Sequence, residues 1–122
     1  MPPDPQERDR ALIFDMMLAA RDALDFVAGM DEQAFLASRL HQNAVIRSIE
    51  VIGEAAGKLS PSFRESHPAT PWREITAMRH RLIHGYAEVR LDVVWAVVRD
   101  RLRPLLAALE MAPHPTNDDA DS

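Results

Sequence analysis

The sequence predicts an all-α protein, a four- to five-helix and mostly antiparallel bundle. Apolar residues recur every three or four positions along most of the chain, which is the spacing of one helix face. No segment shows the alternation of a β-strand, and the 122 residues include only four Gly. Cap residues followed by proline mark several helix starts, so the helices can be placed in order.

The first predicted helix begins in the run Asp4-Pro5-Gln6-Glu7, which combines an N-cap acid, an early proline and the spacing of a capping box. Its apolar face repeats as far as Val27, and Gly29 ends it. Asp31 caps a short second segment, which we expect to extend to about Leu40.

The third predicted helix runs from about His41 to Leu59 and contains two glycines, Gly53 and Gly57, beside its core stripe. Each Gly costs about 1 kcal/mol relative to Ala inside a helix. Such residues are tolerated where another backbone approaches closely. The core stripe itself consists of Val45, Ile49, Ile52, Ala56 and Leu59.

Two cap-plus-proline pairs follow. Ser60-Pro61 begins a short turn of helix, and Thr70-Pro71 begins a fourth helix that reaches about Ile83. The last predicted helix spans about Arg90 to Met111, and Pro104 inside it should cause a kink or an irregular turn. Its core stripe is Leu91, Val94, Trp95, Val98, Leu102, Leu105, Leu106 and Leu109.

The length corresponds to one domain, which we place at residues 1–112, and the acidic, proline-containing tail 113–122 is predicted to be disordered. The chain has no Cys, which excludes disulfides, thiolate metal sites and cysteine nucleophiles. It shows neither a membrane-spanning apolar run nor a signal peptide, so we expect a soluble, cytoplasmic protein.

The net charge of −5 argues against indiscriminate nucleic-acid binding, but the charge is unevenly placed. Residues 1–36 carry three Arg and eight acidic residues, whereas residues 71–109 carry seven Arg and four acidic residues. The second stretch is compatible with a phosphate-bearing partner, and an ordinary solvated surface explains it equally well.

The most informative residue of the fourth helix is Arg79, which falls within its apolar arc. A guanidinium on a packing face needs a carboxylate or phosphate partner, because burying it unpaired is costly. It could pair with Glu50 or Glu54 of the third helix, as a structural ion pair or as support for a functional Arg. The apolar arc comprises Trp72, Ile75, Met78, Leu82, Ile83 and Tyr86.

Two histidines, His80 and His84, lie four residues apart on the same helix. That spacing can hold a metal, but no third ligand is evident, so we expect no metal site and no cofactor. His84 lies at the predicted end of the helix, where the helix dipole favours the protonated imidazole. A titrating His near an Arg suits phosphoryl chemistry on RNA, with the His moving protons and the Arg stabilising charge.

Arg79, His84 and Tyr86 together read R-x-x-x-x-H-x-Y, and in an all-helical chain of this length the motif resembles the HepT family of HEPN-domain ribonuclease toxins. The resemblance extends over about residues 8–110. It includes the blocks Ala44-Val45-Ile46-Arg47, Ile52-Gly53-Glu54-Ala55, Pro71-Trp72-Arg73 and Leu91-Asp92-Val93-Val94-Trp95.

The resemblance implies a homodimer in which the motifs of two protomers face a shared cleft, and a metal-independent endoribonuclease that acts as the toxin of a type VII-like toxin–antitoxin system. It implies that Arg79 and His84 are catalytic. It further implies that an MNT-type nucleotidyltransferase antitoxin transfers AMP to Tyr86 and so silences the enzyme. His80 stands where the family commonly has Asn or another polar residue. We expect His80 and Glu54 to be auxiliary to catalysis at most.

Two alternatives remain from the sequence: a catalytically silent helical subunit that binds or regulates the nucleotidyltransferase, and a plain dimerisation module. The intact triplet favours the nuclease over both. For the dimer contact, the sequence offers the Gly53/Gly57 face with Glu50 and Glu54, which we favour, and the Val93/Val97 face of the last helix.

Overall fold

The structure is a computed structural model that describes residues 4–84 and 90–111, with the helical backbone alone for residues 80–84. Seven helices and no strand occur in these residues, which confirms the all-α prediction. The five helices of ten or more residues are α1 (Pro5–Phe26), α3 (Arg39–Lys58), α5 (Trp72–His84), α6 (Leu91–Asp100) and α7 (Leu102–Met111), and the two short ones are α2 (Glu32–Leu36) and α4 (Pro61–Ser66).

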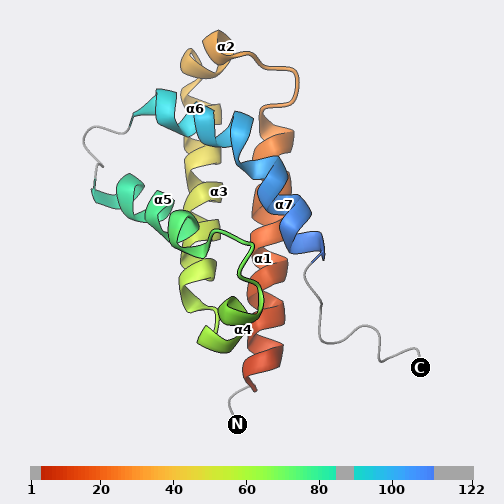
Figure 1. The fold of residues 1–122 in the computed structure, drawn as a ribbon. Helices are drawn as coiled ribbons and strands as arrows, with labels where there is room; N and C mark the ends of the chain where they lie inside the picture. The colour runs from red at the N-terminus through yellow and green to blue at the C-terminus, as the bar shows by residue number, and fades with distance from the viewer. Residues whose placement is uncertain (1–3, 85–89, 112–122) are drawn as a thin grey trace.

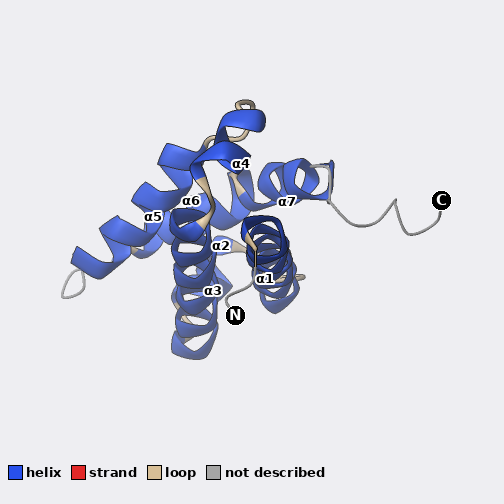
Figure 2. Cartoon of the chain, turned by 90° about the horizontal axis from the view of Figure 1, so that it is seen from below, coloured by secondary structure: helices blue, strands red, loops and turns tan. Residues whose placement is uncertain are grey.

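Helices α1 and α3 are the longest, and they lie side by side as the backbone of the fold (Figure 1). Helix α5 crosses α3, and α7 packs along α1. Seen along the pair, α4, α5 and α7 all lie on one side of α1 and α3 (Figure 2). One hydrophobic core joins these helices, and its largest fully buried side chains are Phe35, Ile13, Met16, Ile49, Ile52, Leu102, Leu109, Val45 and Val94.

The predicted N-caps at Asp4 and Asp31 are present. The Asp4 carboxylate accepts a hydrogen bond from the Glu7 amide at 2.9 Å, and the Asp31 carboxylate accepts one from the Ala34 amide at 2.8 Å. Gly29, with φ of 80°, takes the left-handed conformation just beyond the end of α1. These local contacts explain why the helix starts could be read from the sequence.

The boundary between α2 and α3 differs from the prediction. Ser38 caps α3 by accepting a hydrogen bond from the His41 amide at 3.3 Å, so α3 begins at Arg39. Because an N-cap residue cannot also continue the preceding helix, α2 ends at Leu36 and not near Leu40.

The last predicted helix is two helices, separated at Arg101. Pro104 lies in the first turn of α7, where its missing amide hydrogen would have no helical partner. The irregular turn predicted for Pro104 is therefore confirmed, as a break between α6 and α7. The predicted tail 113–122 lies outside the described residues. Among the described helices, none combines the length and the apolar character needed to cross a membrane.

Candidate active site

Helix α5 carries the motif, and its first half is held firmly. The Trp72 indole donates a hydrogen bond to the His67 carbonyl at 3.0 Å, and its ring meets Phe63 edge to face with ring centroids 6.1 Å apart. Ile75 is 3% exposed, and Trp72 and Met78 pack partly buried against the core. The apolar arc predicted for this helix is therefore confirmed for its first three members. The side chains of Leu82, Ile83 and Tyr86 lie outside the described residues.

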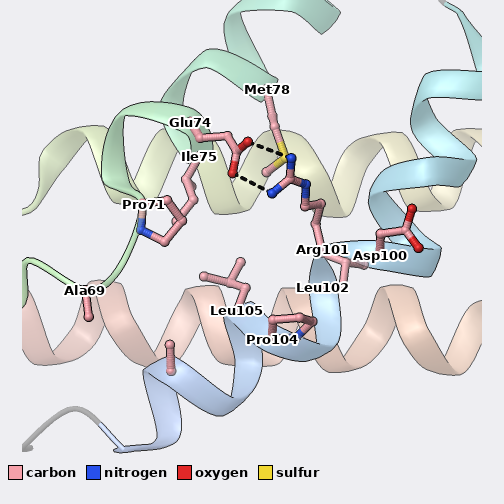
Figure 3. A pocket seen from close by; sticks show the side chains of 11 residues that line it. Ala69, Pro71, Glu74, Ile75, Met78, Asp100, Arg101, Leu102, Pro104 and Leu105 are labelled. Atoms are coloured by element: carbon pink, nitrogen blue, oxygen red, sulfur yellow. Dashed lines mark hydrogen bonds and ion pairs between the residues drawn. The ribbon is translucent and has the colours of Figure 1, made fainter.

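An ion pair adds a second anchor for the same half of α5. Arg101, in the turn between α6 and α7, contacts the Glu74 carboxylate with both terminal guanidinium nitrogens, at 3.0 and 2.9 Å (Figure 3). Beside this pair lies a groove of about 210 Å³ whose walls are mainly apolar and include Pro71, Ile75, Met78 and Leu105. The groove contains no residue of the motif, so we do not assign the catalytic chemistry to it.

Arg79 is half-buried and lies directly on Gly53 of α3. A Cβ added at Gly53 would overlap the Arg79 Cβ and would lie 3.3 Å from its Cγ and 3.4 Å from its Cα. One turn further along α3, a Cβ at Gly57 would meet only the Thr76 Cγ2, at an ordinary 3.9 Å. Of the two glycines, Gly53 is therefore the one at which α5 lies closer to α3, beside Arg79.

The structural pairing considered for Arg79 does not occur among the described residues. Glu50 lies 3.9 Å from Arg47, and Glu54 lies 3.8 Å from Lys58. No hydrogen bond or ion pair joins the Arg79 side chain to either of these carboxylates. Glu54, the predicted auxiliary carboxylate, is exposed on α3 in the position next to Gly53.

The glycine face, which the sequence favours for the dimer contact, needs correction at Gly53. Gly53 is buried, and α5 of the same chain covers it, so this part of the glycine face cannot meet a second chain. Val97 is partly buried against the core, whereas Val93 is 39% exposed. The prediction that another backbone approaches the glycines is confirmed for Gly53, and that backbone is α5, whereas Gly57 is exposed.

The other motif residues are placed only in part. His80 and His84 belong to α5, and His84 is its last residue, as the sequence predicted within one position. Five residues at 1.5 Å each separate Arg79 from His84 by about 7.5 Å along the helix axis. Gly85 and Tyr86 lie outside the described residues. Within the described part of the chain, no cluster of three or more His, Cys, Asp or Glu side chains is arranged to hold a metal.

Arg90, the first described residue after position 89, caps the start of α6. Its guanidinium donates hydrogen bonds to both oxygens of Asp92, the shorter at 2.7 Å. These hydrogen bonds hold the pKa of the Asp92 carboxyl below its usual value and raise the pKa of Arg90. A phosphate group near this end of α6 would compete with Asp92 for the cation.

Residues 16–112, most of the chain, match the family described as ribonuclease HepT-like. The chain belongs to this family. The matched residues include the whole of α3 and α5 and the complete R-x-x-x-x-H-x-Y motif. The family membership predicted from the sequence is confirmed, and so is the enzyme class, an endoribonuclease.

Several curated proteins are similar to the chain over most of its length. "Putative RNase MJ0127" of Methanocaldococcus jannaschii is 35% identical over 98 residues, which are 80% of this chain and 81% of that protein. "Putative RNase MJ1380" of the same organism is 30% identical over 84% of this chain and 94% of its own. "Probable ribonuclease HepT" of Thermococcus cleftensis is 41% identical over 62% of this chain and 69% of its own. No solved structure matches this chain significantly.

Gly53 is the residue whose role the sequence did not reveal. The signal was present, because two glycines four apart in a helix require a close neighbour. The sequence did not say which neighbour, since the pairing of α3 with α5 is a long-range contact. The structure brings Arg79 and Gly53 together across an interface within one chain.

Proposed function

We propose that the chain cuts RNA without a metal ion, with Arg79 and His84 as the catalytic residues. The observation that carries the proposal is that both motif residues lie on one helix, α5, whose path over α3 is fixed beside Arg79. Membership of the ribonuclease HepT-like family supports the RNA substrate. The pairing of a cation with a titratable imidazole supports the reaction type.

The reaction proposed is an intramolecular transesterification. The ribose 2′-oxygen attacks the adjacent phosphorus, and the bond from phosphorus to the 5′-oxygen of the next nucleotide breaks. A base takes the 2′-hydroxyl proton and an acid protonates the leaving 5′-oxygen, so the products are a 2′,3′-cyclic phosphate and a free 5′-hydroxyl. His84 serves as base or acid. Arg79 binds the phosphate and stabilises the charge that develops on its oxygens.

The proposal includes regulation through Tyr86. We place the chain in a type VII-like toxin–antitoxin pair, as the toxin, in which an MNT-type nucleotidyltransferase attaches AMP to the Tyr86 hydroxyl. The added phosphate brings negative charge and bulk close to the motif in sequence. Repulsion of the RNA backbone and occlusion of the site would both stop cleavage, with no change of fold required.

We also propose a homodimer, as the family resemblance implies. Helix α1 bears large exposed apolar side chains, among them Phe14, Leu18 and Phe26 at 56%, 41% and 40% exposure. Leu18 and Phe26 line a hollow of about 390 Å³ between α1 and α3, together with Val51 and the charged Asp15, Asp22 and Arg47. Grouped apolar exposure of this kind is typical of a protein contact, which supports an assembly larger than one chain.

The nuclease is tested by cleavage of a defined RNA in the presence of EDTA. We expect cleavage to persist and the products to end in 2′,3′-cyclic phosphate. His84→Ala should lower the rate by about 10²–10⁴-fold, the usual contribution of a general acid or base. Strict dependence on a divalent ion, or full activity of the folded His84→Ala protein, would refute the mechanism.

The alternative is a catalytically silent subunit that binds or regulates the nucleotidyltransferase. Co-expression with that enzyme followed by intact-mass analysis separates the two. The proposal expects one or more adenylyl adducts on Tyr86, absent in Tyr86→Phe, and loss of cleavage on modification. An adduct without any nuclease activity of the unmodified chain would favour the silent subunit.

A further inference from the structure

We infer that Gly53 is a positioning residue for catalysis, because it sets how closely the motif-bearing end of α5 lies on α3. The inference rests on the proposed function for its catalytic consequence, and on the contact between Gly53 and Arg79 for its geometry. Gly53 does not touch the RNA in this account. It acts through Arg79.

Gly53 can set the position of α5 because its neighbours are the Cα and Cβ of Arg79. A side chain at Gly53 would collide with the Arg79 Cβ and crowd its Cα, not the flexible guanidinium end. The tip of a long side chain can move away by changing rotamer, whereas a Cα and Cβ move only with the helix backbone. A methyl group at Gly53 must therefore displace α5 from α3 at Arg79.

The displacement would act on α5 at Arg79, because the start of the helix is anchored. Trp72, Ile75 and the Glu74–Arg101 pair anchor the first half of the helix. A wedge at Gly53 would therefore push α5 away from α3 at Arg79, while these anchors hold the start of the helix in place.

Gly57 provides a matched control on the same helix and the same interface. A Cβ there lies at ordinary van der Waals distance from Thr76, so Ala fits without moving α5. Both substitutions replace Gly by Ala within α3, and both favour the helix to the same degree. A difference in activity between the two variants therefore reports on the contact with Arg79 and not on a general effect on α3.

The experiment measures kcat and KM for RNA cleavage by the wild-type, Gly53→Ala and Gly57→Ala full-length proteins. We expect Gly53→Ala to lose on the order of 10²-fold in kcat with a much smaller change in KM, because misplacement of a catalytic group by about 1 Å costs that much. Gly57→Ala should keep both constants. Equal kcat values for the two variants would overturn the inference.

A second measurement tests the contact without reference to activity. Melting temperatures of wild type, Gly53→Ala, Arg79→Gly and the double variant form a cycle. Since Arg79→Gly removes the Cβ that a methyl group would strike, Gly53→Ala should lower the melting temperature much less in that background. If Gly53→Ala alone does not fold, the double variant should recover a cooperative transition. An identical loss in both backgrounds, or no recovery, would overturn the inference.

The cleavage assay and the melting cycle test the proposed function and the role of Gly53 separately. If the wild-type protein cuts no RNA, the proposed function fails, and the melting cycle still decides whether Arg79 rests on Gly53. If the wild type cuts RNA and the cycle shows no coupling, the proposed function stands and the positioning role of Gly53 is refuted.

Discussion

Helix α3 contacts α1 and α5, and the two contacts are built on different principles. In the core that α3 shares with α1, the contact is made by aliphatic side chains that are almost fully buried, such as Ile49 and Ile52 of α3 and Ile13 of α1. Towards α5, α3 presents Gly53, and the backbone of α5 rests on it beside Arg79. The contact with α1 depends on large side chains, whereas the contact with α5 depends on the absence of a side chain at Gly53.

The two contacts should have different effects: the α1 contact stabilises the fold, and the α5 contact positions Arg79. Burial of aliphatic side chains supplies free energy of folding in proportion to the area removed from water. A glycine contact supplies little burial and costs helix propensity, but it fixes how near two helices can come. We therefore expect substitutions in the α1 contact to affect the free energy of unfolding, and substitutions in the α5 contact to affect the rate of cleavage.

The largest expected effect on folding is that of Ile52→Ala. Ile52 is completely buried in the core, and truncation of such a residue to Ala removes about 2–5 kcal/mol from the free energy of unfolding. Urea denaturation followed by circular dichroism measures it. The rate of cleavage per folded molecule should stay unchanged. A folded Ile52→Ala protein whose kcat fell as much as that of Gly53→Ala would erase the distinction between the two contacts.

A smaller loss is expected for Ser60→Ala, which tests an anchor between α1 and α4. The buried Asp9 carboxylate accepts hydrogen bonds from the Ser60 amide at 2.9 Å and hydroxyl at 2.6 Å, and the Ser60 hydroxyl also caps the Phe63 amide. Removing the hydroxyl deprives a buried carboxylate of a donor and α4 of its cap, which together should cost about 1–3 kcal/mol. Glu65→Ala, at an exposed position of the same helix, serves as the control and should unfold nearly as the wild type does.

The smallest effect is expected for Glu74→Gln, which weakens the ion pair between α5 and Arg101 in the turn before α7. Both side chains are well exposed, at 42% for Glu74 and 57% for Arg101, so the pair should contribute no more than about 1 kcal/mol. The difference from wild type should shrink further in high salt, because exposed pairs are screened. A loss of several kcal/mol that persists in high salt would show that the pair, and not the apolar contacts, anchors the first half of α5.

Local chemistry is what the sequence revealed best. Asp4, Asp31 and Ser60 cap helices through contacts three residues away, and such contacts are visible in sequence. The cap at Ser38 was missed, because the preceding residues read as a continuing helix. Pro104 marked an irregular turn correctly, but the sequence could not show that the helix ends and restarts at Arg101.

For the candidate active site, too, the sequence predicted local features but not long-range contacts. The motif spacing placed Arg79 and His84 on one helix, which is a local property. The neighbour of Arg79 depends on how α5 crosses α3, and nothing in the spacing of two glycines distinguishes a contact within the chain from a contact between chains. The sequence therefore marked Gly53 as a contact residue, but it did not show that the contact is with α5 of the same chain.

The central claim is that α3 holds Arg79 in place so that its guanidinium can act on RNA. The most direct test compares the cleavage rates of Arg79→Ala and Arg73→Ala with that of the wild type, at equal concentrations of folded protein. Arg79→Ala keeps the Cβ that rests on Gly53, so the fold should be preserved while the charge is lost. Arg73 lies exposed on the same helix outside the motif.

We predict that Arg79→Ala melts close to the wild-type temperature and cuts RNA about 10²–10³-fold more slowly, the usual cost of removing one group that stabilises developing charge. Arg73→Ala should cut at a rate within a few-fold of the wild type. Equal rates for Arg79→Ala and the wild type would contradict the account.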